Sequence, residues 1–416
     1  MKVKHLRVTV PQGPSGLLSK QSQFIYVYAE PSAPEREVSL VMPAERGPFV
    51  SNVLHPIFDM NVPEGFLADQ IRRRMAKHVH VDEMRMLSLI AGNQIGRLSY
   101  EDPSAPAEPI KAQIGLSEIL KESQSEAVFE ALVNMYFASG ISGVQPKVLV
   151  PDMDKRMTMV SSDLIVKSGS SEFPTLAQNE FLCMDVARRV GLKVPAFWLS
   201  DNNQLFVIER FDLVDGQTLG FEDMAVLLRL AKDPHDNYKY SQSYEIIAQV
   251  VATLCGGRLE ELEAFFTSFC VSVMIRNGDA HLKNFGLLYT HPGDHGSIGL
   301  SPTFDLTTTS IYPVPNPRTG QFIYDRSMAL KLNKSKDYPT HQQLIAFGQT
   351  YCQVRRPERI LERIAQAMTE TLEAHATRVD ADLHQLISKE WAAGQVTALI
   401  PALGKPIRRG PPIKKP

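Results

Sequence analysis

The chain has 416 residues, a formal net charge of −2, 44% hydrophobic residues and 22% charged residues. These values are ordinary for a globular protein, and a chain of this length can bury the cores of two or three domains. A charge near zero gives no overall attraction to nucleic acid or anionic lipid. The four cysteines are widely spaced without a C-x-x-C pair, which argues against a zinc knuckle or a disulfide framework and is typical of a reducing cytosol.

The sequence also lacks the signals of membrane insertion. The N-terminus "MKVKHLRVTVPQG" has no apolar core of signal-peptide length. No run approaches the roughly 18 apolar residues that a membrane span requires. We therefore expect a cytoplasmic protein that does not contact a membrane.

The first hundred residues predict a small β-rich module followed by helices. Residues 1 to about 60 alternate in short strand-like runs that Pro- and Gly-containing turns separate. A helical pattern begins at Pro63 and runs to about Gly92, and "QIGRLSYED" then indicates a strand. The Pro- and Ala-rich segment 102–113 has the composition of a linker to a second domain.

The rest of the chain predicts a domain with a β-rich half, about 140–211, and a helical half. Strands are expected at "RMTMVS", "SDLIVKSG" and in "VPAFWLSDNNQLFVIERFD". Between them, "TLAQNEFLCMDVARRVGL" has helical spacing and stops at Gly191. From Phe221 the pattern is mostly helical, except around 285–312 and 322–332. The predicted divisions are 1–112, 113–212, 213–403 and a disordered basic tail, 404–416.

Three segments of the β-rich half are suited to phosphate or nucleotide binding. The loop "SGISGVQPK", residues 139–147, carries glycines, serines and a lysine that suit backbone contact with phosphates. Lys167 closes an apolar strand, which is typical of a surface lysine and also of a lysine that pairs with ATP phosphates. "VIERFD", residues 207–212, ends a strand where a two-lobed kinase would offer its hinge to adenine.

The helical half contains the most specific pattern. In "NGDAHLKNFGLLY", Asn284 follows Asp279 by five positions, which is the D-x-x-x-x-N spacing of a kinase catalytic loop. Asp305 lies 21 residues further on, where a kinase has its second metal ligand, and oxygen donors of this kind suit Mg²⁺. Alternatively, Asp279 caps a turn and Asp305 caps a helix at "DLTTTS". The order and spacing of all the segments favour phosphoryl transfer.

These segments resemble the HipA family, the serine/threonine kinase toxins of bacterial type II toxin–antitoxin pairs. The resemblance rests on "SGVQPK", "LIVK", "QNEFLCMDVARRVGL", "VIERFD", "NGDAHLKNFGLLY" and "PTFDLTTT", between about 139 and 310. It implies an α+β, two-lobed protein-kinase-like fold with a small β-rich N-terminal subdomain and a mostly helical C-terminal lobe. It also implies ATP and Mg²⁺ as cofactors, a protein substrate such as an aminoacyl-tRNA synthetase, and a helix-turn-helix antitoxin through which operator DNA is mainly contacted.

The resemblance further implies roles for single residues. Asp279 would be the catalytic base, His281 would stabilise the catalytic loop, and Asn284 and Asp305 would bind magnesium. Contacts with ATP are expected from Ser142, Gly143, Val144, Gln145, Pro146 and Lys147, from Lys167 with Glu180 as the residue that positions it, from the hinge Glu209, Arg210 and Phe211, and from His281, Lys283, Asn284, Phe304 and Asp305.

One position departs from the family pattern. The serine that the family's best-known members autophosphorylate is replaced by Gly140, with Ser139 and Ser142 on either side. Autophosphorylation would therefore use a shifted site, for which Ser142 is the candidate. A phosphate there would place about two negative charges beside those of ATP and open the loop.

Two other function classes stay open. Small-molecule and lipid phosphotransferases use the same D-x-x-x-x-N loop. A regulator that binds ATP or DNA with little catalysis would use the basic tail and "IRRRMAKH", residues 71–78, although such stretches are more often solvated surface. The intact Asp279, Asn284 and Asp305 favour an enzyme.

Overall fold

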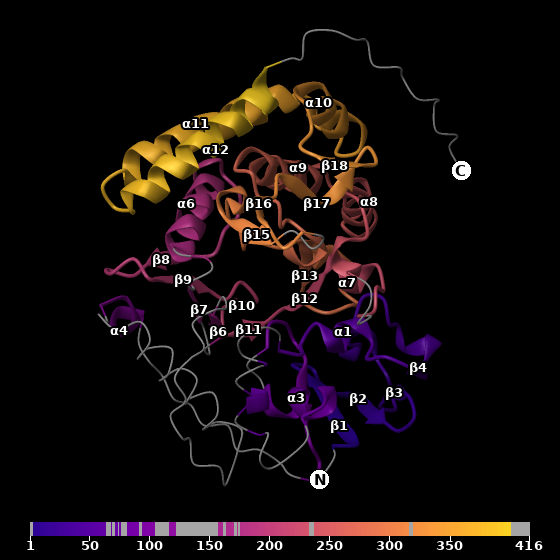
Figure 1. The fold of residues 1–416 in the computed structure, drawn as a ribbon. Helices are drawn as coiled ribbons and strands as arrows, with labels where there is room; N and C mark the ends of the chain where they lie inside the picture. The colour runs from indigo at the N-terminus through magenta and orange to yellow at the C-terminus, as the bar shows by residue number, and fades with distance from the viewer. Residues whose placement is uncertain are drawn as a thin grey trace.

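A computed structural model describes residues 3–63, 71–73, 81–90, 94–104, 116–121, 157–160, 164–169, 175–232, 237–315 and 319–400, together with residues 68, 75 and 173. The N-terminal module is an antiparallel sheet with the strand order β4-β3-β2-β1-β5 (Figure 1). Helices of the same module pack against this sheet. The elements are β1 (His5–Val10), β2 (Gly13–Lys20), β3 (Phe24–Tyr28), β4 (Phe49–Ser51), α1 (Pro56–Asp59), α3 (Glu83–Ile90) and β5 (Ser99–Glu101).

Alternation of side chains explains this sheet. In β1, Leu6, Val8 and Val10 are buried while the residues between them are exposed or half-buried, because successive side chains of a strand point to opposite faces. Leu6 pairs with Leu18 of β2, so that the apolar positions of both strands share one face. The core that forms there includes Tyr26 and Phe58, whose ring centroids lie 5.0 Å apart.

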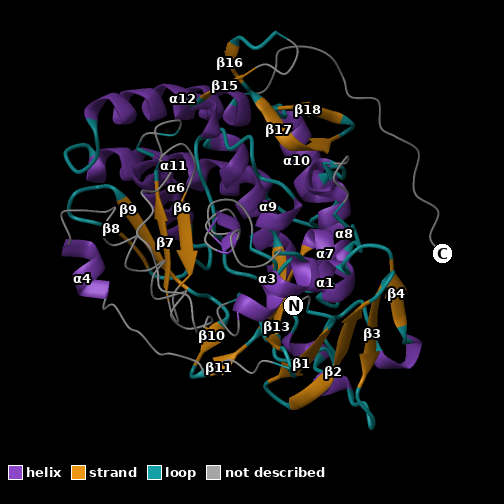
Figure 2. Cartoon of the chain, turned by 60° about the horizontal axis from the view of Figure 1, so that its bottom comes forward, coloured by secondary structure: helices purple, strands orange, loops and turns teal. Residues whose placement is uncertain are grey.

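The second domain begins with another antiparallel sheet, in the order β6-β7-β9-β8. Figure 2 shows this sheet apart from that of the N-terminal module, with α6 beside it. Lys167 of β7 pairs with Phe206 of β9, and Gly191 has the positive φ, +90°, that ends a helix readily. The elements are α4 (Leu116–Lys121), β6 (Met157–Val160), β7 (Leu164–Ser168), α6 (Leu176–Arg189), β8 (Phe197–Leu199) and β9 (Leu205–Glu209).

The C-terminal lobe packs helices around α9, whose residues from Phe265 to Met274 are all buried. A short sheet, β12-β13-β14, lies at its edge. The elements are β10 (Leu213–Val214), β11 (Gln217–Thr218), β12 (Gly220–Asp223), α7 (Met224–Leu227), α8 (Tyr244–Leu254), α9 (Leu259–Met274), β13 (Gly286–Tyr289), β14 (Gly299–Leu300), β15 (Pro313–Pro315), β16 (Phe322–Tyr324), β17 (Ser327–Leu332), β18 (Ser335–Asp337), α10 (His341–Thr350), α11 (Pro357–His375) and α12 (Ala381–Leu399).

Buried carboxylates join the N-terminal module to the second domain. Glu222 of β12 accepts hydrogen bonds from Ser39 Oγ and the Leu40 amide, each at 2.7 Å. Asp212 is fully buried and accepts the Gly96 amide at 2.8 Å. Burial of a carboxylate without such donors would be costly, so these contacts hold the two parts in one arrangement.

The predicted fold class is confirmed: a β-rich N-terminal region precedes a sheet-containing lobe and a mostly helical lobe. One boundary differs. Phe221, where the helical pattern was expected to begin, lies in strand β12, because that strand pairs with β13 through Phe221 and Leu288. No helix among the described residues is long and apolar enough to cross a membrane.

Candidate active site

The loop between α9 and β13 is shaped by close backbone packing. The chain leaves the buried helix through Arg276, which has a φ of +60°. At Gly278 a Cβ atom would lie 2.7 Å from the carbonyl oxygen of Ser327, so that only glycine fits. The Gly278 amide donates to Thr309 Oγ1 at 2.6 Å. This packing fixes the backbone immediately before Asp279.

Within the loop, Asn277 and Asn284 hold the backbone on either side of the carboxylate. Asn277 is buried and its Oδ1 accepts the Asp279 amide at 3.0 Å. Asn284 Oδ1 accepts the His281 amide at 2.9 Å, and the 3₁₀ turn η4 (Leu282–Asn284) follows. The spacing D-x-x-x-x-N therefore places both polar side chains in one tight turn.

Four predicted residues from four segments meet in one hydrogen-bonded array. Lys167 Nζ lies 2.6 Å from Glu180 Oε1 and 2.9 Å from Asp305 Oδ1. The other oxygen of Asp305 accepts the side-chain amide of Asn284 at 2.9 Å. Strand β7, helix α6, the loop between α9 and β13 and the loop after β14 thus each supply one polar group.

The exposed fraction of the side chains increases across the array. The side chain of Glu180 is 1% exposed, that of Lys167 is 12% exposed and that of Asp305 is 25% exposed. Glu180 therefore anchors the lysine from the interior, while Asp305 faces the accessible side. Removing one partner of a pair shielded in this way costs more than removing one partner of a surface pair, because it leaves a buried charge uncompensated.

Asp305 also has strained backbone geometry. Its φ of +60° lies in the left-handed region, which costs energy for a residue other than glycine and is frequent at functional sites. The helical turn after it, η6 (Thr309–Ile311), has Thr308 at its N-cap. Asp305 therefore does not cap this turn, and the alternative explanation for its position loses its support.

Asn179 fixes the segment that follows Asp305. Its Nδ2 donates to the Thr308 carbonyl at 3.0 Å, and its Oδ1 accepts the Thr308 amide at 2.9 Å. Trp391 Nε1 donates to Thr308 Oγ1 at 2.8 Å. Because Asn179 precedes Glu180 on α6, this helix supports both Lys167 and the segment that follows Asp305.

The residues of the array suit a nucleotide with Mg²⁺. Magnesium prefers hard oxygen donors and completes its shell with phosphates and water, and Asn284 and Asp305 offer an amide and a carboxylate side by side. Both oxygens of Asp305 already accept hydrogen bonds, from Lys167 and from the Asn284 amide. A bound cation would therefore replace one of these donors or bind to the same oxygen beside it. Lys167 would then be directed to the phosphates.

His281 lies against Asp279 as a buried imidazole. Burial lowers the pKa of His281, with a smaller opposing effect from Asp279 and smaller lowering effects from Lys239 and Lys283. Its Nδ1 has no hydrogen-bond partner among the described residues. Its ring packs edge to face on Tyr240 at a centroid distance of 5.2 Å. The neutral ring therefore supports the loop by packing.

The three residues of the predicted hinge have different surroundings. Glu209 ends β9 and is exposed. Arg210 is buried, and its guanidinium bonds to Asp212 at 2.7 Å and to the Gln94 carbonyl at 2.8 Å, so this side chain joins the N-terminal module. The ring of Phe211 stacks on Phe304 with centroids 5.1 Å apart. Contact with adenine remains a prediction for all of these hinge residues.

The remaining predicted residues are Lys283 and the residues of the phosphate loop. Lys283 is half-buried in η4, beside Asn284. Six predicted phosphate-loop residues lie outside the described residues: Ser142, Gly143, Val144, Gln145, Pro146 and Lys147. Ser139 and Gly140 lie outside them as well.

The sequence did not reveal two supporting residues. Asn179 lies directly before Glu180 and four positions before the buried Cys183, whose Sγ contacts Asn179 Oδ1 at 3.3 Å, and this helical spacing is the one signal that the sequence offers for it. Tyr240, whose hydroxyl lies 2.7 Å from Asp279 Oδ1, is 39 residues away in sequence and belongs to no recognisable motif.

Comparison with known proteins finds two family models that match the chain. The model of the HipA N-terminal domain matches residues 6–101, and that of the HipA-like C-terminal domain matches residues 139–376. The putative kinase Y4dM of Sinorhizobium fredii is 26% identical over 286 residues, which cover 62% of this chain and 63% of that protein. A putative kinase of Haemophilus influenzae is 30% identical over 190 residues, 42% of this chain and 53% of that protein.

These matches therefore span less than two thirds of either relative. Among solved structures, the toxin–antitoxin system HipA of Shewanella oneidensis MR-1, in complex with HipB and its operator DNA, has a TM-score of 0.62 at 17% identity. The alignment covers 94% of this chain and 96% of that one. The two chains share their fold.

Proposed function

The chain belongs to the HipA family, whose N-terminal and C-terminal domain models together match most of it, and on this basis we propose that it is a serine/threonine protein kinase toxin that uses ATP and Mg²⁺. The observation that carries the proposal is the array of Lys167, Glu180, Asn284 and Asp305. A lysine held by a helix glutamate, next to an asparagine side chain that is hydrogen-bonded to an aspartate, is the arrangement that protein kinases use for ATP phosphates and magnesium.

Each residue then has a chemical task. Asn284 and Asp305 would hold Mg²⁺, which supplies positive charge to the phosphate oxygens during transfer. Lys167 donates hydrogen bonds to phosphate oxygens, and Glu180 keeps it in place. Asp279 accepts a hydrogen bond from the serine or threonine hydroxyl, aligns its oxygen with the phosphorus and receives its proton. Alignment and charge account for most of the catalysis in this type of reaction.

The toxin role and its partners follow from the family. We propose a protein substrate such as an aminoacyl-tRNA synthetase, and a helix-turn-helix antitoxin that contacts operator DNA. The solved relative from Shewanella oneidensis is a complex of this kind. We also propose that the protein acts in the cytoplasm and that Ser142 is its site of autophosphorylation.

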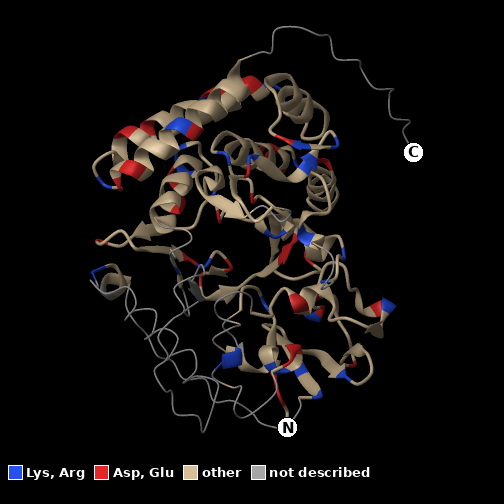
Figure 3. Ribbon diagram, viewed as in Figure 1, with Lys and Arg blue, Asp and Glu red and all other residues tan. Residues whose placement is uncertain are grey.

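Two alternatives stand beside this proposal. Along the described ribbon, acidic and basic residues are interspersed (Figure 3). The basic stretches that a DNA-binding regulator would use, 404–416 and half of 71–78, lie outside the described residues. A small-molecule phosphotransferase remains the second candidate, because the same array would serve it.

Expression in bacteria tests the proposed toxin kinase. Cells that express the wild type alone should stop growing, whereas cells that express Asp279→Ala at equal level should grow normally. Co-expression with the proposed helix-turn-helix antitoxin should restore growth and yield a complex on purification. Equal growth inhibition by wild type and Asp279→Ala would show that toxicity does not come from phosphoryl transfer.

A further inference from the structure

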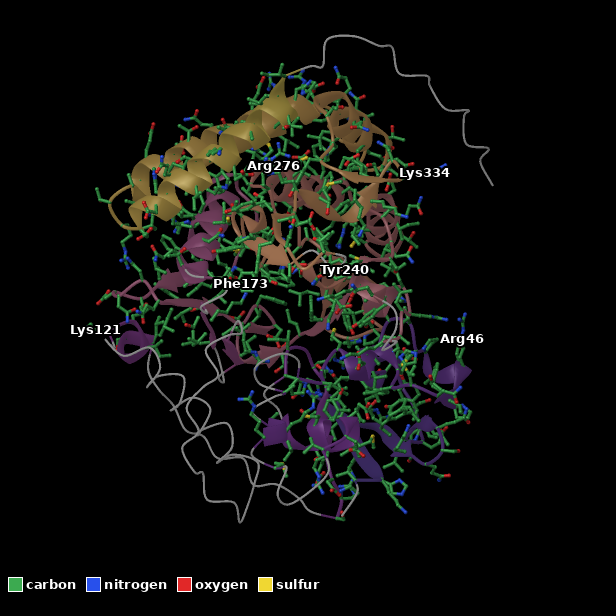
Figure 4. The ribbon with its side chains drawn as sticks, in the orientation of Figure 1. Arg46, Lys121, Phe173, Tyr240, Arg276 and Lys334 are labelled. Atoms are coloured by element: carbon green, nitrogen blue, oxygen red, sulfur yellow. The ribbon has the colours of Figure 1, made fainter. Side chains whose placement is uncertain are left out.

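Tyr240 makes a direct contact with the predicted catalytic carboxylate. It lies in the 3₁₀ turn η3 (Tyr238–Tyr240), between α7 and α8, and Figure 4 shows it near the middle of the molecule. Its hydroxyl lies 2.7 Å from Asp279 Oδ1. Within the described part of the chain, no residue donates a hydrogen bond to the other oxygen, Oδ2, which leaves Oδ2 for an acceptor hydroxyl.

The surroundings keep this hydroxyl in the role of donor. Burial, followed by the charge of Asp279, raises the pKa of Tyr240, so the phenol stays protonated. An ionised carboxylate only accepts hydrogen bonds, and the bond must therefore run from Tyr240 to Asp279. The ammonium groups of Lys239 and Lys336 lie 5.1 and 5.8 Å from the centroid of the Tyr240 ring. At these distances a cation is attracted to the face of an aromatic ring, which helps to hold the ring in place.

The position of the ring is also fixed. It packs edge to face on His281 at 5.2 Å, and the Tyr240 amide donates to the Asn237 carbonyl at 2.8 Å. Tyr240 thus approaches Asp279 from a different segment than the catalytic loop. The loop itself fixes the backbone of Asp279 through Asn277, but among the described residues only Tyr240 bonds to its carboxylate.

We propose that Tyr240 is a positioning residue that orients the Asp279 carboxylate toward the acceptor hydroxyl. The hydrogen bond to Oδ1 restricts rotation of the carboxylate and leaves Oδ2 for the acceptor hydroxyl. Among the described residues, no hydrogen bond joins Tyr240 to Lys167, Asn284 or Asp305, and its ring contact with His281, a residue also expected near ATP, does not involve the hydroxyl. Its effect should therefore fall on the transfer step and not on ATP binding. This inference rests on the proposed kinase activity.

Tyr240→Phe removes the hydroxyl and keeps the ring against His281. A matched control is Tyr351→Phe, which changes a tyrosine at the end of α10 whose ring packs on Phe347. Two activities are measured with γ-labelled Mg-ATP: transfer to dephosphorylated casein, and ADP formation with water as the acceptor. Calorimetry gives ATP affinity separately, and thermal melting confirms that each variant is folded.

The expected result for Tyr240→Phe is a fall in kcat of about tenfold, since small misalignments in an active site cost up to about 100-fold. The KM and affinity for ATP should stay at wild-type values, and Tyr351→Phe should match the wild type throughout. A kcat that is unchanged or higher in Tyr240→Phe would overturn the positioning role, the higher value indicating that Tyr240 blocks the acceptor site. A wild type that forms no ADP and labels no casein would overturn the proposed kinase activity and this inference together.

Discussion

Lys167 Nζ lies 2.9 Å from Asp305 Oδ1 although 138 residues separate them in the chain. The lysine belongs to the β6-β7-β9-β8 sheet, and the aspartate belongs to a loop of the helical C-terminal lobe. Since Glu180 holds the same ammonium group at 2.6 Å, the contact joins strand, helix and loop across the boundary between lobes. It combines a stabilising ion pair with the residues expected to bind ATP.

Lys167→Met should therefore weaken both folding and ATP binding. The carboxylate of Glu180 is almost fully buried, and removing the charged partner of a buried carboxylate costs about 3–5 kcal/mol. Chemical denaturation should show a loss of this order, and calorimetry should show weaker ATP binding. Lys331→Met, at an exposed position of β17, serves as the control. Equal stability of the two variants would mean that the Lys167 pair contributes little.

Asp305→Ala and Asn284→Ala should both reduce the effect of magnesium on ATP binding, and Asp305→Ala should have the larger effect. A carboxylate offers a full charge to the cation, whereas an amide offers only a dipole. Calorimetric titration of ATP with and without Mg²⁺ measures the difference. If Asp305→Ala binds Mg-ATP like the wild type, the residue serves only the structure of its loop.

Asn179→Ala should destabilise the protein, because the Thr308 amide and carbonyl would both lose a buried partner. A buried group left without its hydrogen bond costs about 1–3 kcal/mol. Gln178→Ala, the neighbouring substitution, also removes one hydrogen bond, to the Asp380 amide, and is the comparison. Asn179→Ala should also lose affinity for Mg-ATP, whereas Gln178→Ala should keep the affinity of the wild type. Equal affinities would show that Thr308 does not hold the metal-site loop in place.

Glu222 should make stability depend on pH. Burial raises the pKa of this carboxyl above its ordinary 4.5, against the lowering effect of hydrogen bonds from Tyr289, Leu40 and Ser39. The folded state therefore binds the proton more tightly than the unfolded state, and the free energy of unfolding falls as pH rises from about 4.5 through the raised pKa. Glu222→Gln lacks this proton.

The measurement for Glu222 is the free energy of unfolding of wild type and Glu222→Gln at several pH values from 4.5 to 8. The variant should gain stability relative to the wild type as the pH increases. Parallel curves for the two proteins would mean that Glu222 does not titrate in this range.

The sequence predicted the site residues that lie within motifs, and it missed those that act across the fold. The D-x-x-x-x-N spacing is local, so it indicated Asp279 and Asn284, and the 21-residue interval indicated Asp305. Lys167 and Glu180 were expected through the family resemblance, and they meet in the structure. Tyr240 and Asn179 contact these segments from 39 and 129 positions away, distances at which a single sequence carries no pattern.

The fold shows the same division. Alternating apolar residues predicted β1 and β3, and helical spacing with Gly191 predicted α6. The similar run "EVSLVM", residues 37–42, was expected to be a strand and forms none. The contribution of Arg210 was not predictable in this way. Its place in "VIERFD" indicated a hinge, whereas its guanidinium joins Asp212 and the Gln94 carbonyl, because the N-terminal module packs there. Such long-range packing depends on the complete arrangement of domains.

The transfer of labelled phosphate from Mg-ATP by wild type and Asp279→Ala tests the central claim most directly. Both proteins are incubated with γ-labelled ATP and a bacterial lysate, and thermal melting is recorded in parallel. Wild type should label protein on serine or threonine, while Asp279→Ala should reduce labelling by at least about 100-fold, the scale of general base catalysis, at an unchanged melting temperature. Equal labelling by both proteins would contradict the assignment of Asp279 and the kinase mechanism built on it.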